Sequence, residues 1–353
     1  MNAAAAPSTE PVRPEVEAFL RQHGATGGLQ LLPLPGGANN RVYHVPQAAG
    51  DWVLKCYFRH PLDQRDRFGA ERTFYEWLWS RSIRRTPEPI GLFPERRLGL
   101  LTFVPGRKLH PAEVDADRVQ EALDFVVELN TARHLPAAQA MPSGSEACFR
   151  PAEHLACVDL RVARLQNIET PDALDQQAAR FVRDRLVPAW QRLRGAIRQA
   201  VAASGTRLDA PLASTDRCLS PSDFGFHNAL LTSDGRLRFF DFEYAGWDDP
   251  AKLVCDFFCQ PQLPVSHGHW AVFLERLQRE VAPDPGFSAR ARLLLPAYQV
   301  KWCAIMLNEF VPGEQSRRAY AAGTGLSADR KAAQLAKAEA ALAKAVELWA
   351  RGA

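Results

Sequence analysis

The chain has 353 residues, of which 43 are lysine or arginine and 40 are aspartate or glutamate, so its formal net charge is only +3. A balance this even does not indicate a nucleic-acid partner or an anionic membrane surface. No apolar run reaches the length of a membrane span, and the seven cysteines lack the spacing of a disulfide framework. We therefore expect a cytoplasmic protein with reduced thiols and a chain long enough for two lobes.

The N-terminal stretch reads MNAAAAPSTEPVRPE, without a basic leader or a sustained apolar segment. It predicts a disordered tail over residues 1–13 and no signal peptide. A helix is expected to begin at Pro14, to place Phe19 and Leu20 on one face, and to end at Gly24.

Three strand-like runs follow, at 29–34, 41–45 and 52–57. The segment between the first two contains Gly36, Gly37, Asn39 and Asn40. Glycines let a backbone approach a phosphate closely and turn its N–H groups toward it. The same composition also makes ordinary hairpin turns, and taken alone it favours a turn.

A lysine in the third run has a candidate partner on the next helix. Lys55 points to one face of its strand, and the helix expected to start near Pro61 carries Phe68 and Tyr75 on its apolar stripe. Glu71 lies on that stripe, one turn from each aromatic residue. A buried carboxylate needs a cation, so we predict an ion pair with Lys55; the alternative is two separate surface residues.

The run 98–104 predicts a strand, which the sequence alone favours as an edge strand followed by a turn at Pro105-Gly106. The rest is expected to be mainly helical. One helix is predicted to begin at Pro171, capped by Thr170, with a kink or break at Pro188. Further periodic stretches lie at 119–127, 271–280, 289–309 and 327–351. The last is expected to dock on the domain through Leu335, Leu342, Val346 and Trp349.

The most informative stretch, residues 220–243, reads SPSDFGFHNALLTSDGRLRFFDFE. Asp223 is followed five positions later by Asn228, and Asp241 opens an Asp-Phe-Glu triplet. A two-residue turn at Asp234-Gly235 predicts a hairpin in which Asn228 lies opposite Asp241. A paired amide and carboxylate, with Asp223 on the loop before them, form the set that magnesium-dependent phosphoryl transfer requires.

Asp-x-x-x-x-Asn followed by Asp-Phe-Glu resembles the catalytic loop and metal motif of the protein-kinase-like fold. More narrowly, it resembles the aminoglycoside phosphotransferase and choline kinase family, and the resemblance extends diffusely through most of residues 30–260. Two positions depart from the family pattern. Pro221 stands where histidine is usual, and Leu253 stands at the last acidic place of an Asp-Pro-x-x-Asp run.

The resemblance implies an α+β, two-lobed protein-kinase-like fold. A small antiparallel-sheet lobe over 1–104 would bind the nucleotide, and a larger, mainly helical lobe over 105–353 would carry catalysis and the substrate. It also implies that Asp223 accepts the proton of the substrate hydroxyl, while Asn228 and Asp241 hold Mg2+.

The resemblance further implies where ATP is bound. Lys55 would hold the phosphates and Glu71 would hold Lys55. The backbone from Thr102 to Val104 would contact the adenine edge. The family's nucleotide loop corresponds to Gly36, Gly37, Asn39 and Asn40.

The expected function is ATP-dependent transfer of the γ-phosphoryl group to a hydroxyl of a small molecule, such as an aminoglycoside, an amino-alcohol or a sugar. A nucleotide-binding pseudokinase scaffold is an alternative that Pro221 and Leu253 would permit. A protein kinase is disfavoured because no Ala-Pro-Glu run follows Asp241.

Several acidic residues follow the triplet closely in sequence. Near Tyr244 and Trp247, such a group would suit a cationic or sugar acceptor. It would equally suit acids that cap helices and brace the catalytic loop. The residues concerned are Glu243, Asp248, Asp249 and Asp256.

Overall fold

The computed structural model describes residues 13–34, 40–57, 65–311 and 328–350. These form two compact units. The first comprises the described residues of Met1–Arg107 together with Leu230–Glu243, and the second comprises Lys108–Ala229 and the described residues from Tyr244 onward. The segment that contains Asp241 therefore belongs to the same unit as the N-terminal sheet, although it is distant from that sheet in sequence.

A five-stranded antiparallel sheet in the order β1-β2-β3-β5-β4 lies at the centre of the first unit. Its strands are β1 (Leu32–Pro33), β2 (Arg41–Val45), β3 (Trp52–Cys56), β4 (Pro89–Phe93) and β5 (Leu98–Thr102). Tyr43, Leu54 and Leu100 oppose one another across three strands and are buried. Because β5 lies between β3 and β4, the expectation of an edge strand is wrong.

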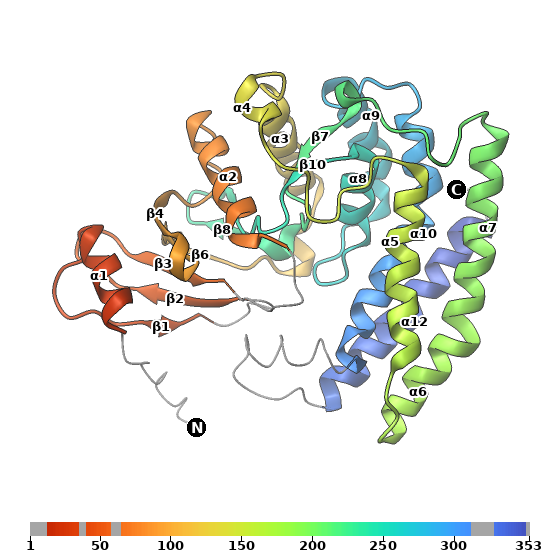
Figure 1. Ribbon diagram of the computed structural model, residues 1–353, viewed down its shortest axis with the longest axis horizontal. Helices are drawn as coiled ribbons and strands as arrows, with labels where there is room; N and C mark the ends of the chain where they lie inside the picture. Colours follow the sequence, from red (N-terminus) through yellow and green to blue (C-terminus); the bar gives the residue numbers. More distant parts are fainter. Residues whose placement is uncertain (1–12, 35–39, 58–64, 312–327, 351–353) are drawn as a thin grey trace. The chain divides into compact units, whose positions relative to one another are not determined.

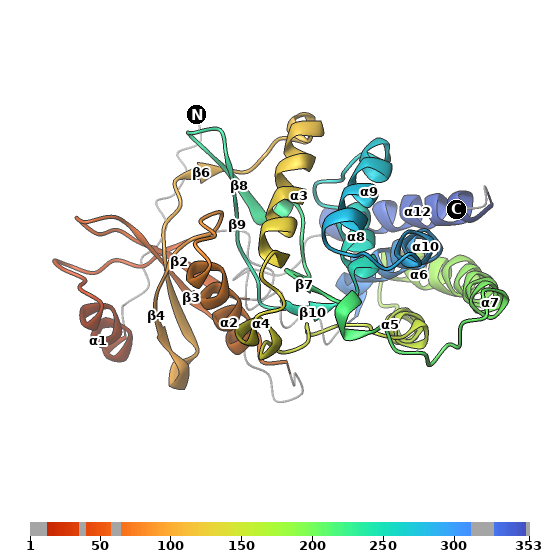
Figure 2. The same cartoon turned by 90° about the horizontal axis from the view of Figure 1, so that it is seen from above.

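Two helices cover the two faces of this sheet, as Figure 2 shows. α1 (Pro14–Gln22) packs Phe19 and Leu20 against the apolar row, and Gly24, with a φ of 94°, follows its end as predicted. α2 (Arg67–Ser80) lies on the opposite face. It begins later than Pro61 because the side chain of Asp66 accepts a hydrogen bond from the Gly69 amide and caps it there.

The hairpin before Asp241 has a different turn from the predicted one. It comprises β8 (Ala229–Thr232) and β9 (Leu237–Phe239), with β6 (Gly106–Arg107) on the other side of β8. The Thr232 amide donates to the Arg236 carbonyl and the Gly235 amide donates to the Thr232 carbonyl. Residues 233–235 thus form a three-residue loop, with Gly235 at a φ of 75°. Thr232, not Ser233, faces Arg236, and the count that placed Asn228 opposite Asp241 is wrong by one residue.

The second unit is mainly helical, and Figure 1 shows α5, α6, α7, α10 and α12 running beside one another. Its only regular sheet among the described residues pairs β7 (Cys218–Ser220) with β10 (Gly246–Asp248) in antiparallel fashion. None of the helices in the described part of the chain combines the length and apolar character that a membrane span requires. The α-helices are α3 (Ala116–Asn130), α4 (Pro136–Gln139), α5 (Pro151–Arg164), α6 (Ala173–Phe181), α7 (Val187–Ala203), α8 (Pro250–Cys259), α9 (Trp270–Glu280), α10 (Phe287–Met306) and α12 (Ala328–Ala350).

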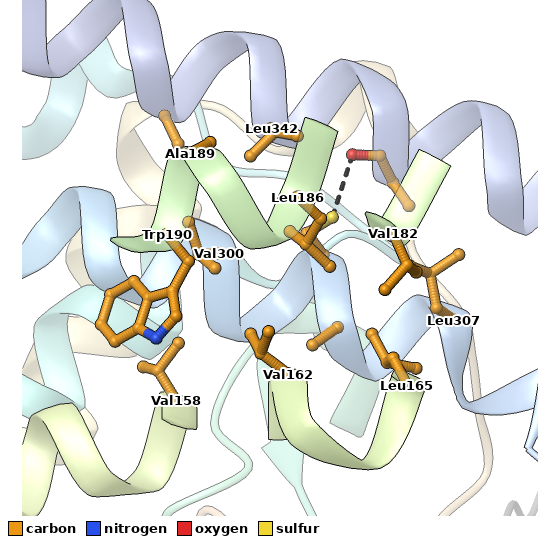
Figure 3. Close-up of a cluster of buried hydrophobic side chains, with 14 of the residues drawn as sticks. Val158, Val162, Leu165, Val182, Leu186, Ala189, Trp190, Val300, Leu307 and Leu342 are labelled. Carbon is orange, nitrogen blue, oxygen red and sulfur yellow. Dashed lines mark hydrogen bonds between the residues drawn. The ribbon is translucent and has the colours of Figure 1, made fainter. Parts of the chain in front are cut away.

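The C-terminal helix docks on this unit as predicted. Leu335 and Leu342 of α12 are buried in a cluster with residues of α5, α7 and α10, including Trp190 and Val300 (Figure 3). The Cys303 thiol of α10 donates to the Ala338 carbonyl of α12 at 3.2 Å. Val346 is 48% exposed, so its predicted place on the docked face is wrong.

The helix around Pro188 is continuous but locally widened. Proline has no N–H to donate and its ring crowds the carbonyl four residues earlier, here that of Asp184. The structure accommodates this with one π-helical turn, η4 (Val182–Leu186), directly before α7. At the start of α6 the predicted cap is wrong, because Asp172 rather than Thr170 accepts the hydrogen bond, from the Asp175 amide.

Candidate active site

Lys55 on β3 lies between two carboxylates of the first unit. Its Nζ is 2.7 Å from Oε2 of Glu71 and 2.6 Å from Oδ1 of Asp241, and the residue is only 6% exposed. Burial alone would lower the pKa of Lys55, but Asp241 and Glu71 outweigh burial and the pKa is raised. Lys55 is therefore a fixed ammonium group, and the predicted ion pair with Glu71 is confirmed.

Three donors hold the buried carboxylate of Glu71. Besides Lys55, the Tyr57 hydroxyl donates to Oε2 at 2.6 Å, and the Phe242 amide donates to Oε1 at 3.1 Å. Glu71 thus joins α2 to β3 and to the Asp-Phe-Glu segment. Tyr57 was not predicted, although its position two residues after Lys55 placed it on the same side of the strand.

Asp241 has a φ of 70°, the left-handed region that few residues other than glycine adopt and that Asp and Asn tolerate best. The side chain of the next residue, Phe242, anchors this conformation. Phe242 is buried with its centroid 4.9 Å from that of Phe74 and 5.2 Å from that of Tyr75, both on α2. The packing leaves the side chain of Asp241 33% exposed while Lys55 holds one of its oxygens.

Glu243, the last residue of the triplet, braces the first unit. Its Oε2 accepts a hydrogen bond from Nδ2 of Asn40 at 2.5 Å, and its Oε1 lies 3.3 Å from Nη1 of Arg67, with all three residues buried. The structure therefore gives the Asn40 side chain a protein partner. Gly36, Gly37 and Asn39 lie outside the described residues, so the role of this loop at a nucleotide stays a prediction.

In the segment expected at the adenine edge, residues 102–104, two of the three backbone amides donate hydrogen bonds within the protein. The Thr102 amide donates to the Glu88 carbonyl at 2.9 Å, and the Phe103 amide donates to the Asp51 carbonyl at 2.8 Å. The amide of Val104 has no hydrogen-bond partner within the described part of the chain. Among these three amides, Val104 is therefore the one donor available for an adenine.

In the second unit, Asp223 lies on a tight loop between β7 and η6 (Phe226–Asn228). Nδ2 of Asn228 donates to the Asp223 carbonyl at 2.9 Å and closes the loop. Phe224 and Phe226 anchor the loop in the core, with ring centroids 5.3 and 5.6 Å from that of Phe257. The Asp223 side chain is 35% exposed, so its carboxylate is both positioned and accessible.

Serine hydroxyls and a neighbouring helix brace the loop at Pro221, where the family pattern has histidine. Ser222, at a φ of 65°, donates its hydroxyl to the Tyr244 carbonyl at 2.8 Å, and its amide donates to the Ser220 hydroxyl at 3.0 Å. Asn130 of α3 accepts from the Leu219 amide at 2.8 Å. These contacts fix the backbone of the loop without a histidine at this position.

The acidic residues after the triplet serve as internal braces. Lys252 lies 2.9 Å from Asp248 and 3.2 Å from Asp256, and Lys301 donates to both oxygens of Asp256 at 2.8 and 2.9 Å. Asp249 caps α8 by accepting from the Ala251 amide at 2.8 Å. All of these acids are buried, so the bracing interpretation is the correct one.

Lys301→Met is expected to destabilise the protein by about 3 kcal/mol, because it removes one partner of a buried ion pair. Burial would raise the pKa of Asp256, but Lys301 and Lys252 lower it below its usual 3.8. The stability that Asp256 contributes is therefore present above pH 3.8 and is lost as the pH falls below it. Urea titrations at pH values across this range should show that the free energy of unfolding falls less steeply with decreasing pH in the variant than in the parent.

The matched control for this change is Arg207→Met, which removes an ion pair to Asp209 in which both side chains are exposed. A solvent-exposed ion pair contributes little to stability, so this variant should unfold like the parent. Equal stabilities of the Lys301 variant, the Arg207 variant and the parent would contradict the assigned role of the buried pair.

Lys55 and Glu71 are expected to act as one unit in catalysis. Lys55→Ala and Glu71→Ala should each lower kcat/KM for ATP, and the double variant should be little worse than Lys55→Ala alone, because Glu71 acts through Lys55. The coupling energy from a double-mutant cycle should lie at about 1–3 kcal/mol.

The control for this cycle uses Glu76, which is exposed on the same helix. Combined with Lys55→Ala, Glu76→Ala should give effects that simply add. A coupling near zero for the Lys55–Glu71 cycle would mean that the ion pair has no part in the reaction.

Comparison with known proteins identifies the family of this chain. A family model described as the Phosphotransferase enzyme family matches residues 30–287. Comparison with the curated proteins gives no match.

Three solved structures show the same fold. A choline/ethanolamine kinase family protein from Mesorhizobium loti shares 19% identity over 95% of this chain and 97% of its own, with a TM-score of 0.56. The choline kinase of Streptococcus pneumoniae shares 12% over 94% and 98%, with a TM-score of 0.58. A spectinomycin phosphotransferase solved with ADP and spectinomycin shares 11% over 96% and 98%, with a TM-score of 0.57.

These likenesses confirm the predicted α+β kinase-like fold, with its antiparallel sheet in the N-terminal part and a mainly helical remainder. The family model covers well over half of the chain. The chain belongs to the Phosphotransferase enzyme family.

Proposed function

We propose that this phosphotransferase moves the γ-phosphoryl group of ATP onto a hydroxyl of a small molecule, with Asp223 as the base. The observation that carries the proposal is the placement of Lys55 between Glu71 and Asp241. A fixed ammonium beside a partly exposed carboxylate suits the binding of nucleotide phosphates, and this chemistry consists almost entirely of positioning and electrostatics.

We assign the binding of ATP and the activation of the acceptor to separate residues. Lys55 binds the phosphates of ATP, Glu71 keeps the ammonium in place, and Val104 donates its amide to the adenine. Asp223, accessible on its anchored loop, accepts the proton of the acceptor hydroxyl as the new P–O bond forms. The bond between the γ-phosphorus and the bridging oxygen of ADP breaks, so the sum is ATP plus alcohol to ADP plus phosphate ester plus a proton.

The donor atoms of Asp241 and Asn228 fit magnesium, which prefers hard oxygen ligands. Asp241 offers a partly exposed carboxylate, and Asn228 uses its amide nitrogen on the Asp223 carbonyl, which leaves its side-chain oxygen as a ligand. When bound, magnesium would neutralise negative charge on the phosphates. We assign these two residues as its protein ligands.

A cytoplasmic location is part of the same proposal. ATP is the proposed phosphoryl donor, all seven cysteines are free thiols, and the net charge is close to neutral. We expect no nucleic-acid or membrane partner, and a small hydroxyl compound as the second substrate.

The acceptor class can be tested by measuring ADP formation with purified protein, ATP and magnesium. Separate panels of amino-alcohols, aminoglycosides and sugars should be compared, because the similar solved structures include a choline kinase and a spectinomycin phosphotransferase. We expect one panel to stimulate ADP formation well above the rate without acceptor. Tight nucleotide binding without stimulation by any panel would favour the pseudokinase scaffold instead.

A further inference from the structure

His227 contacts the proposed base but has no role in the account above. It lies in η6, four positions after Asp223, and its side chain is 8% exposed. Its Nε2 is 3.2 Å from Oδ1 of Asp223. Its Nδ1 is buried and has no hydrogen-bond partner among the residues that the structure describes.

These two environments determine which ring nitrogen carries the proton. A proton on Nδ1 would be a buried donor without an acceptor, and a bare Nε2 would then face a carboxylate oxygen. A proton on Nε2 instead donates to Asp223 and leaves only a lone pair unsatisfied. We infer that His227 is the Nε2–H tautomer and a hydrogen-bond donor to Asp223.

The backbone holds the ring in this position. A Cβ at residue 225 would lie 2.8 Å from Nδ1 of His227, so Gly225 leaves the room that the ring occupies. On the other side, Nζ of Lys108 donates to the His227 carbonyl at 2.5 Å. Within the described residues, Oδ2 of Asp223 accepts no hydrogen bond, so the contact with His227 involves Oδ1 alone.

We propose that His227 is the positioning residue for Asp223. Its Nε2–H holds Oδ1, and Oδ2 is then the oxygen directed to the acceptor hydroxyl. This assignment rests on the proposed function and adds to it the residue that sets the orientation of the base.

The kinetic test compares His227→Leu with His227→Gln, whose amide nitrogen can replace Nε2 as a hydrogen-bond donor. His227→Leu should lower kcat by about 10- to 100-fold, the effect expected of a hydrogen bond to a charged group, with KM for ATP unchanged. His227→Gln should recover most of the loss. Equal losses in both variants, or no loss in either, would overturn the proposal.

A matched control is His267→Leu in the same unit. Burial lowers the pKa of His267 to about 4, so this substitution removes a neutral, partly buried ring, and His267 has no hydrogen bond to Asp223. Its kcat should equal that of the parent. A comparable loss in this variant would show that the effect of His227→Leu is general destabilisation.

Nitrogen-15 NMR of the histidine rings tests the contact without any need for activity. The parent should show His227 as the Nε2–H tautomer, and Asp223→Ala should shift its Nε2 signal. An Nδ1–H tautomer, or a signal insensitive to Asp223, would overturn the assignment. A parent that transfers no phosphoryl group would instead refute the proposed function, and the NMR result would still decide whether His227 holds Asp223.

Discussion

Asp223→Asn is expected to lower kcat by about a thousandfold while the affinity for ATP stays within about twofold of the parent, because general bases contribute roughly 10²–10⁴-fold. Asparagine keeps the size of the side chain and the backbone contact that closes the loop, since Asn228 donates to the main-chain carbonyl of residue 223. It removes the charge that accepts the proton. Steady-state kinetics with a saturating acceptor, together with calorimetric titration of ATP, would separate these two effects.

The fold of this variant can be verified independently by its thermal unfolding midpoint. Asp223 is 35% exposed, and asparagine keeps a side-chain oxygen that can accept the hydrogen bond from His227, so the midpoint should be nearly unchanged. Turnover close to that of the parent in a folded variant would remove Asp223 from the role of base.

Asp241→Asn is expected to weaken magnesium-dependent ATP binding by about 10- to 100-fold, the loss expected when a contact to a charged group is removed. Asparagine tolerates the left-handed backbone at this position, so the substitution should leave the segment in place. Glu71 still pairs with Lys55 in the variant. Calorimetric titrations of ATP, one with magnesium and one with a chelator, would show the loss: magnesium should raise the affinity for ATP less in the variant than in the parent.

Asn228→Ala is the comparison for this experiment. It removes a neutral ligand rather than a charged one, so magnesium-dependent ATP binding should fall less than in Asp241→Asn. If magnesium raised the affinity for ATP equally in both variants and in the parent, neither residue would belong to the metal site.

The ion pair between Lys55 and Glu71 was predictable because both signals are local. The strand alternation places Lys55 on one face, and the helical period places Glu71 on a buried stripe that needs a cation. The partners of Glu243 were not predictable, because Asn40 and Arg67 are far away in the chain and ordinary in their own sequence context. The order of strands in the sheet is likewise a long-range property, so β5 was wrongly expected at the edge.

At the turn before Asp241, the local sequence is compatible with two types of hairpin loop. Asp-Gly suits a two-residue turn, but it equally suits a three-residue loop in which glycine takes the left-handed position. The structure adopts the second, and one residue of register changes every opposed pair in the hairpin. The start of α6 is ambiguous in the same way, because Thr170 and Asp172 are both residue types that cap helices. Only Asp172 accepts the capping hydrogen bond.

Phosphorus NMR of the reaction products shows whether this protein transfers a phosphoryl group to an alcohol. Purified protein, ATP and magnesium would be incubated with the acceptor panels, in parallel with Asp223→Asn. A phosphate-ester resonance is expected to appear together with ADP in the parent and to be absent in the variant over the same time. ADP with inorganic phosphate as the only other product, or an ester signal equally strong in the variant, would contradict it.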